Sequence, residues 1–175
     1  MNYKGSVVAS VPWVPTNDEV IEKLIEVLKE HTMKLGRGLF VDIGCGDGRV
    51  AIAVAQRLGL PTLCVEVKAE LAARARRNVE RAGVGHLVDV LQGDFFTFDF
   101  SRAKYVYMYL LLSVNTKLEP KLRTELNKGT LVITLDFPIP GWKSVKQIEL
   151  DHRSWQRRLY VYLKGVSDDH TPALT

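Results

Sequence analysis

The sequence predicts an α/β fold, a doubly wound and mostly parallel sheet of seven strands that ends in an antiparallel hairpin. Short apolar runs alternate with amphipathic stretches of about 10–15 residues, the pattern of parallel strands joined by helices. A glycine-rich turn at residues 44–48 joins the first apolar run to the amphipathic stretch that follows it. The last two strand-like segments lie too close together for a parallel crossover, so they should pair antiparallel.

The first elements of the chain are an extended arm and a helix. Residues 1–15 contain Pro12 and Pro15, which favour extended geometry, so we expect an arm that lies over the domain. Thr16 and Glu19 form a T-x-x-E capping box, which predicts a helix from Thr16 to about residue 30. Its apolar face carries Ile21, Leu24, Ile25 and Leu28, at the spacing of successive helical turns.

Two units of strand and helix follow. The apolar runs at residues 38–44 and 61–67 are typical of short strands that are buried on both faces. The helical patterns at residues 48–59 and 69–83 each end in a glycine, which commonly closes a helix.

The remaining elements complete the sheet. Further strands are expected at residues 87–94, 103–112, 129–137, 144–150 and 157–163. The helix expected at residues 114–126 contains Pro120, which is tolerated as the first residue of a second helical part. Only six residues separate the last two strands, which therefore form the hairpin.

Composition and cysteine content narrow the class of protein. The chain has 175 residues, 46% of them hydrophobic, which suits one domain over residues 1–175, with residues 1–15 as the arm. No apolar run is long enough to cross a bilayer and no signal-like segment opens the chain, so we expect a cytoplasmic protein without membrane contact. Cys45 and Cys64 show neither a disulfide framework nor metal-ligand spacing, which predicts reduced cysteines and no metal.

The positive charge leaves the class of partner open. A net charge of +4 permits weak attraction to nucleic acid and is also an ordinary solubility charge. The basic helical stretch with Arg74, Arg77 and Arg81 has no interleaved aromatic residues, so it is better explained as a solvated face. We expect a monomer with no specific nucleic-acid partner.

The glycine-rich turn predicts a ligand crevice. In doubly wound sheets the ligand binds beyond the carboxyl ends of the strands, where Gly44, Gly46 and Gly48 lie. The dinucleotide pattern G-x-G-x-x-G fails, because Arg49 stands at its last glycine position. Asp42, at the end of the preceding strand, would repel a pyrophosphate and attract an ammonium or sulfonium group, which favours a cationic ligand.

Two further acids end neighbouring strands. Glu66 ends the second strand, where a carboxylate accepts hydrogen bonds from ribose hydroxyls in many nucleotide sites. Asp94 ends the third strand and precedes Phe95, so the pair can offer a polar contact and an aromatic face to an adenine ring. For Asp94, a helix cap or a loop acid is an equally good interpretation.

The segments "DIGCGDG" and "GDFF" together with Glu66 resemble the class I methyltransferases that use S-adenosylmethionine, and the resemblance spans nearly the whole chain. It implies that Asp42 reaches the methionine amino group of the cofactor and that Gly44 and Gly46 admit the cofactor. It further implies that Glu66 holds the ribose and Asp94 the adenine, and that Thr16 also contacts the cofactor.

Later segments point to the methyl acceptor. "YLLLSVN" follows the fourth strand and lacks the N-P-P-Y or D-P-P-Y with which related enzymes hold a planar amine. "VPWVPT", "VDIGCGDGRV", "YLLLSVNTKLEPKLRTEL" and "FPIPGW" resemble the small broad-specificity protein lysine methyltransferases of crenarchaea and their mitochondrial relatives that methylate a lysine of the ATP synthase c-subunit. The core is also similar to the non-SET histone lysine methyltransferases. The resemblance implies protein lysine methylation of broad specificity.

Lysine chemistry sets a requirement for the site. The attacking amine must be neutral, yet a pKa near 10.4 leaves only about 0.04% neutral at pH 7, a deficit of roughly 4.6 kcal/mol. An apolar channel beside the sulfonium would lower the lysine pKa. The candidates to wall this channel are Trp13, Leu110, Leu111 and Trp142, each of which is also explained by ordinary packing.

Asn115 is a further candidate, because by resemblance its amide orients the amine or the cofactor; an N-cap role is the alternative. No His or Cys is placed as a base, so the proton should leave to water. The expected partners are proteins with exposed lysines, chromatin-associated proteins among them. Two alternatives stay open: an RNA or small-molecule amine methyltransferase with the same cofactor site, and an inactive cofactor-binding protein that serves as a partner of another chain.

Overall fold

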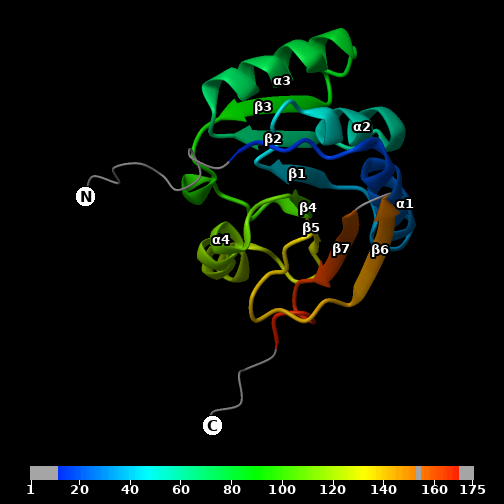
Figure 1. Cartoon of the computed structure of the whole chain (residues 1–175), viewed down its shortest axis with the longest axis vertical. Helices are drawn as coiled ribbons and strands as arrows, with labels where there is room; N and C mark the ends of the chain where they lie inside the picture. The colour runs from blue at the N-terminus through cyan, green and yellow to red at the C-terminus, as the bar shows by residue number, and fades with distance from the viewer. Residues whose placement is uncertain (1–11, 153–154, 170–175) are drawn as a thin grey trace, which may run out of the picture.

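The computed structural model describes residues 12–152 and 155–169 and shows one seven-stranded sheet with helices on both faces (Figure 1). The strand order is β3-β2-β1-β4-β5-β7-β6. The strands are Leu39–Ile43 (β1), Thr62–Glu66 (β2), Val88–Gln92 (β3), Ala103–Met108 (β4), Leu131–Leu135 (β5), Lys146–His152 (β6) and Trp155–Leu163 (β7).

Strand pairing follows the expected pattern. β1 to β5 pair in parallel, whereas β7 runs antiparallel to both β5 and β6. The predicted fold class, a mostly parallel sheet that ends in an antiparallel hairpin, is confirmed. The sheet reverses its order between β1 and β4, so the carboxyl ends of β1 and β4 border a crevice.

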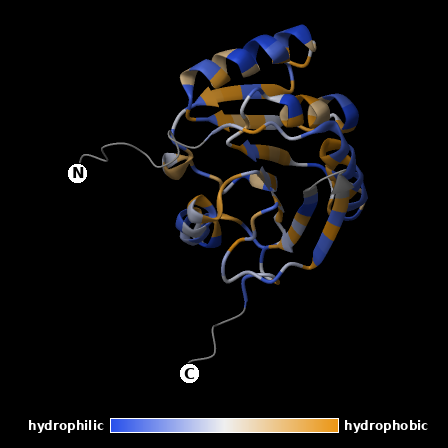
Figure 2. Ribbon diagram, viewed as in Figure 1, coloured by the Kyte–Doolittle hydropathy of each residue, from blue (hydrophilic) through white to orange (hydrophobic). Residues whose placement is uncertain are grey.

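The helices cover the two faces unequally. They are Asp18–Leu35 (α1), Arg49–Leu58 (α2), Ala69–Arg81 (α3) and Leu112–Glu125 (α4), and a short 3-10 turn, η2, spans Phe95–Thr97. α1 and α2 pack on the face that carries Phe40 and Tyr105, and α3 packs beside α2. α4 packs on the opposite face against Val106 and Val132. Apolar colour dominates β2 and β3, whereas β6 mixes polar and apolar colour and α3 is mostly polar (Figure 2).

α1 begins one residue later than the sequence predicted. Asn17, not Thr16, is its N-cap, and the Asn17 side chain accepts a hydrogen bond of 3.0 Å from the Val20 N–H. The capping box on Thr16 is therefore wrong, because Asn is as good a cap and stands one position closer to the helix. The helix also continues past residue 30 and ends at Leu35, where Gly36 has a φ of +83°.

α4 is one continuous helix through Pro120, so the prediction that Pro120 begins a second helical part is wrong. Proline removes one N–H from the helical ladder. The Thr124 hydroxyl donates to the Pro120 carbonyl at 2.8 Å, which supplies a local side-chain bond in this turn. The packing of Leu118 and Leu122 in the core holds the helix together on either side.

The two cysteines form a disulfide between the turn after β1 and strand β2, with their Cα atoms 5.4 Å apart. The expectation of two reduced cysteines is thus wrong. Cys45 and Cys64 are 19 residues apart and lie on either side of α2, so no local sequence pattern predicts that they pair. Parallel pairing of β1 with β2, in which Asp42 faces Cys64, brings them together.

We expect the Cys45–Cys64 bond to stabilise the fold by about 3 kcal/mol, the chain-entropy value for a loop of this length. Cys64→Ala should lower the free energy of unfolding by a larger amount in non-reducing buffer than in dithiothreitol, where the parent protein also lacks the bond. Alkylation in denaturant without reductant, followed by mass spectrometry, should label no cysteine of the parent. Two labelled cysteines would contradict the pairing.

Candidate functional site

A cavity opens at the carboxyl ends of β1, β2, β4 and β5, where the glycine-rich turn begins. One part of its lining comes from β1, β2, the segments that follow them and Thr16, and it carries most of the polar side chains of the cavity beside Val50, Val67 and Leu71. The other part follows β4 and β5 and is mostly apolar. The residues on the polar side are Thr16, Asp42, Gly44, Cys45, Asp47, Arg49, Glu66 and Lys68. Those on the apolar side are Tyr109, Leu110, Leu111, Val114 and Phe137.

Asp42 is a buried carboxylate without a full set of partners. It is 2% exposed, and its Oδ2 atom has no hydrogen-bond partner in the described structure. Burial raises the pKa of Asp42 well above its usual value, and the nearby carboxylates of Glu66 and Asp47 raise this pKa further. A buried carboxyl oxygen that faces a cavity is completed by a cationic or hydrogen-bond-donating ligand.

Glu66 joins the second strand to the glycine-rich turn. Its Oε2 accepts the Gly46 N–H at 2.8 Å and its Oε1 accepts the Lys68 N–H at 2.9 Å. Each carboxylate oxygen has two acceptor sites, so both oxygens keep capacity for ligand hydroxyls. This arrangement fits the ribose role that the sequence resemblance assigned to Glu66.

Close approach explains two of the glycines in the turn. A Cβ at Gly44 would lie 2.8 Å from Cδ2 of Leu110, and one at Gly46 would lie 2.1 Å from Nε1 of Trp13. Both glycines also have positive φ, +74° and +58°, which disfavours other residues. Gly44 lines the cavity, whereas Gly46 itself lies under Trp13.

The described part of the N-terminal arm closes one side of the cavity, and Pro12, Trp13, Val14, Pro15 and Thr16 line it. The guanidinium carbons of Arg49 and Arg74 lie 5.9 and 5.7 Å from the Trp13 ring centroid, which holds the indole between α2 and α3. Thr16 is buried and shares a 3.0 Å hydrogen bond with the Tyr107 hydroxyl. Residues 1–11 of the predicted arm lie outside the described residues.

The structure separates Asp94 from Phe95. Phe95 is fully buried and lines the cavity. Asp94 does not line it and instead caps η2, where its Oδ1 accepts the Phe96 N–H at 2.9 Å. This is the capping role that the sequence offered as the alternative to an adenine contact.

Asn115 lies within the helix, so the N-cap role is wrong: Leu111 precedes α4 as its N-cap. The Asn115 amide nitrogen donates to the carbonyls of Phe137 at 3.0 Å and Pro138 at 3.2 Å. Its Oδ1 is buried and has no partner in the described structure. Asn115 thus fixes the backbone that carries Phe137 into the cavity wall.

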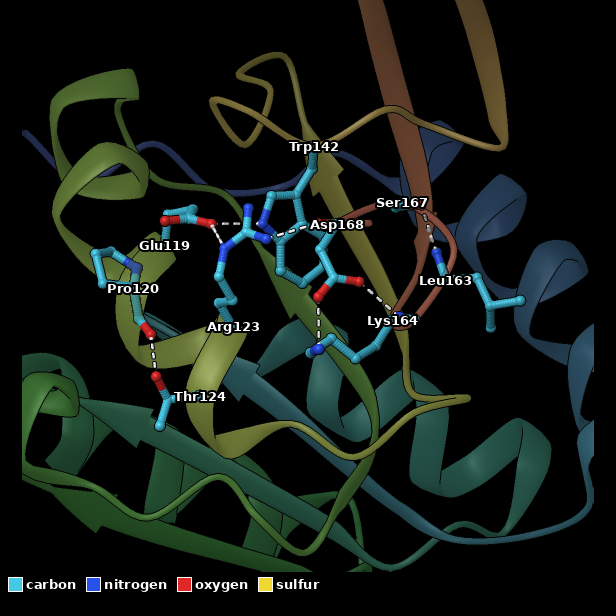
Figure 3. A network of polar contacts seen from close by, with 10 residues as sticks. Glu119, Pro120, Arg123, Thr124, Trp142, Leu163, Lys164, Ser167 and Asp168 are labelled. Carbon is cyan, nitrogen blue, oxygen red and sulfur yellow. Dashed lines mark hydrogen bonds and ion pairs between the residues drawn. The ribbon is translucent and has the colours of Figure 1, made fainter. Parts of the chain in front are cut away.

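Trp142 does not line the cavity, because its side chain packs against α4 and Tyr162 instead (Figure 3). Its indole N–H donates to Glu119 at 2.8 Å, and its ring meets Tyr162 edge-on at 6.0 Å between centroids. Glu119 also binds Arg123, which donates to the Asp168 carbonyl at 2.6 Å. Trp142 therefore fastens the segment after β5 and the segment around Asp168 to α4.

Tyr107, Tyr109 and Phe137 are among the lining residues that were not singled out from the sequence. The alternation of side chains along β4 carries a weak signal for the tyrosines, since both follow the same face. Phe137 depends on the backbone turn after β5, for which the sequence gives no local pattern. Within the described residues, no group of three or more His, Cys, Asp or Glu side chains is arranged to hold a metal.

Comparisons with known proteins point to one family. A family model for the ANTKMT methyltransferase domain matches residues 42–146. A protein-lysine N-methyltransferase from Saccharolobus islandicus is 35% identical over 161 residues, which cover 91% of this chain and 98% of that protein. An ATP synthase C-subunit lysine N-methyltransferase from Xenopus laevis is 33% identical over 132 residues, 75% of this chain and 56% of that protein.

A solved structure has the same fold and a bound cofactor product. The crystal structure of an RNA methyltransferase from Salinibacter ruber in complex with S-adenosyl-L-homocysteine has a TM-score of 0.77 and is 33% identical. The match covers 91% of this chain and 97% of that one. The polar side of the cavity fits S-adenosylmethionine, because the orphaned oxygen of Asp42 and the remaining acceptors of Glu66 suit its ammonium and ribose groups.

The raised pKa of Asp42 predicts pH-dependent cofactor binding. A cation favours the ionised carboxylate, so binding should release a proton, and the affinity should fall as the pH is lowered through the raised pKa. Calorimetry with S-adenosylmethionine from about pH 8 down to about pH 5, in two buffers of different ionisation enthalpy, measures both effects. Asp42→Asn should bind weakly at every pH. A parent affinity that is constant over this range would contradict the assignment.

The contact of Trp13 with the turn predicts that the arm supports the cofactor site. Deletion of residues 1–15 should weaken S-adenosylmethionine binding about tenfold or more, while the melting temperature changes little. Deletion of residues 1–11 is the matched control, because it keeps Pro12 to Thr16 and should bind as the full chain does. Equal affinity of all three proteins for S-adenosylmethionine would contradict this role of the arm.

Proposed function

The chain belongs to the ANTKMT methyltransferase domain family, and from this membership we propose that it transfers a methyl group from S-adenosylmethionine to lysine side chains of protein substrates. The enzyme is an S-adenosylmethionine-dependent methyltransferase. The observation that carries the lysine assignment is the 35% identity to a protein-lysine N-methyltransferase over 98% of its length. The two-sided cavity agrees with it.

The polar side of the cavity binds and orients the cofactor. When bound, S-adenosylmethionine supplies an electrophilic methyl group on a sulfonium. Asp42 lies in β1 and Glu66 at the end of β2, whereas Thr16 lies in the arm before α1 and is tied to the sheet by its hydrogen bond to Tyr107 of β4. Such a scaffold fixes the direction of the methyl group relative to the acceptor.

The apolar side favours the reactive form of lysine. Leu110, Val114 and Phe137 have no polar side-chain atom, and Val114 is 2% exposed. Removing an ammonium from water into such surroundings lowers its pKa, and a neighbouring positive charge lowers it further. Both effects recover part of the free energy needed to present a neutral amine. The proton released on the product side leaves to water.

Broad specificity is our proposal for substrate choice. Val14, Leu111 and Leu112 are 53%, 39% and 45% exposed, and Val14 and Leu111 line the cavity. Aliphatic side chains contact a neighbouring chain without selecting a particular polar group. This rim supports recognition of an exposed lysine rather than of one sequence around it. Methylation of chromatin-associated proteins, a monomeric state and a cytoplasmic location stay predictions from the sequence.

None of the helices in the described residues is long and apolar enough to span a membrane.

The single-domain organisation over residues 1–175 is a further proposal. It is supported by one continuous sheet that joins elements from Leu39 to Leu163.

RNA methylation is the second candidate, and the observation in its favour is the likeness to the RNA methyltransferase from Salinibacter ruber. That structure contains S-adenosyl-L-homocysteine, and a cofactor site alone does not select the methyl acceptor. An inactive cofactor-binding protein is the remaining alternative, against which the complete polar side of the cavity argues.

An incubation with methyl-labelled S-adenosylmethionine and cell lysate separates these candidates. We expect label in protein that survives nuclease and is lost with protease, and labelled peptides should carry it on lysine. Asp42→Asn is the control and should transfer almost no label. Label lost with nuclease would move the acceptor to RNA, and cofactor binding without any transfer would favour the inactive protein.

A further inference from the structure

The disulfide between Cys45 and Cys64 borders the polar side of the cavity. Cys45 belongs to the glycine-rich turn and lines the cavity, and Cys64 stands in β2, two residues before Glu66. In the sheet register Cys64 faces Asp42 of β1. The bond therefore joins the turn to the strand that carries the second acid of the cofactor site.

Hydrogen bonds hold the turn against β2 at the same place. The N–H groups of Gly44 and Cys45 donate to the Val65 carbonyl at 2.8 and 3.2 Å. The Gly46 N–H donates to Oε2 of Glu66 at 2.8 Å. The disulfide adds a covalent link to these contacts, so the backbone that lines the cofactor cavity and the bond are parts of one structure.

Charge and chain flexibility both act against this closed turn. The carboxylates of Glu66 and Asp47 raise the pKa of Asp42, because each repels the ionised form of Asp42. Gly44 and Gly46 have positive φ, and glycine gains more conformational freedom than other residues when a turn opens. The disulfide opposes both effects, because it keeps the turn attached to β2.

The packing around the disulfide leaves little room for a thiol. Cys64 is fully buried and Cys45 is 7% exposed. Both cysteines pack in an apolar cluster with Ala51, Ala75 and Val88, which come from α2, α3 and β3. A thiolate must reach a cysteine sulfur to break the bond, so reduction requires the turn to open locally. Any contact that keeps the turn closed therefore also protects the bond.

A cofactor in the cavity would supply such contacts. The unpartnered Oδ2 of Asp42 lies in β1, and Glu66 keeps acceptor capacity at the end of β2. A ligand that engages both groups ties the two strands together beside the turn. A positive charge on this ligand also reduces the repulsion between the carboxylates.

We propose that the Cys45–Cys64 bond couples the thiol redox state of the surroundings to the cofactor site: reduction weakens binding of S-adenosylmethionine, and bound cofactor protects the bond from reduction. The two effects are equal in size, since the coupling free energy between two equilibria is reciprocal. The inference goes beyond the proposed function, because it concerns the cofactor site and holds for any methyl acceptor.

The reductant is a dithiol, either a small molecule or a protein. Its thiolate attacks one cysteine sulfur, the S–S bond between Cys45 and Cys64 breaks, and the other cysteine leaves as a thiolate. The second thiol of the reductant then displaces the first cysteine, and the reductant becomes a disulfide. Two electrons pass to the chain, and the two protons of the reductant end on the two cysteines. An oxidised dithiol reverses the reaction.

Calorimetry with S-adenosylhomocysteine on the oxidised and the reduced full chain measures the first effect, and thiol counts confirm each state. We expect the reduced chain to bind about tenfold more weakly, within the usual range of coupling between sites. Circular dichroism should show that both states are folded at the temperature of the measurement. Equal affinities would overturn the inference. A reduced chain that unfolds at this temperature would also overturn it, because the bond would then act through global stability.

A redox titration measures the second effect. The full chain is equilibrated in mixtures of reduced and oxidised dithiothreitol, with and without saturating S-adenosylhomocysteine, and free thiols are counted by alkylation and mass spectrometry. With ligand the midpoint should move about tenfold toward the reducing mixtures, or about 30 mV for a two-electron couple. An unmoved midpoint would overturn the inference. Neither measurement uses a methyl acceptor, so a failure of lysine methylation leaves this test intact.

Cys64→Ala is the matched control. Cys64 does not line the cavity, so the change removes the bond and keeps every lining residue. The variant should bind S-adenosylhomocysteine as weakly as the reduced parent does, and dithiothreitol should not change its affinity. A tenfold loss of its affinity in dithiothreitol would show that the reductant acts elsewhere and would overturn the inference. An affinity equal to that of the oxidised parent would do the same.

Discussion

The carboxylate of Asp42 is the constraint around which the site is built. It lies at the end of a central strand, between Cys64 of β2 and Tyr107 of β4 in the sheet register, and one of its oxygens has no partner in the described structure. A buried and incompletely bonded carboxyl group costs stability, so the apolar core on both faces of the sheet must offset it. We propose that a positively charged group of the cofactor removes this cost, which would couple cofactor binding to the ionisation of Asp42.

We propose that the two halves of the sheet have separate roles, one in cofactor binding and one in binding the methyl acceptor. β1 and β2 present carboxylates and the glycine-rich turn, whereas β4 and β5 lead into a wall of Leu110, Val114 and Phe137. The polar half tolerates a charged ligand, and the apolar half favours a neutral nucleophile. Asn115 and Asp136 keep the second half in shape, through hydrogen bonds to the Phe137 carbonyl and through the turn before it.

Local patterns predicted most of the fold and the polar half of the site. Strands and helices follow from side-chain periodicity, and Asp42, Gly44 and Glu66 stand in a contiguous motif or at a strand end. Other features depend on contacts between segments that are distant in the sequence. These are the Cys45–Cys64 bond, the position of Trp142 and the approach of Arg157 to Tyr109. The prediction for Trp142 was wrong because an aromatic residue after a proline-rich turn packs equally well into the wall of a cavity or into the core.

The charge on the polar side also bears on product release. Asp42, Asp47 and Glu66 lie close enough that the two others raise the pKa of Asp42. When bound, S-adenosylmethionine would bring an ammonium and a sulfonium, and its product would keep only the ammonium, while the lysine nitrogen would gain the positive charge. The product ammonium then lies in apolar surroundings that disfavour it. Both changes would weaken binding of the products relative to the substrates, so we propose that the arrangement that favours the reaction also favours product release.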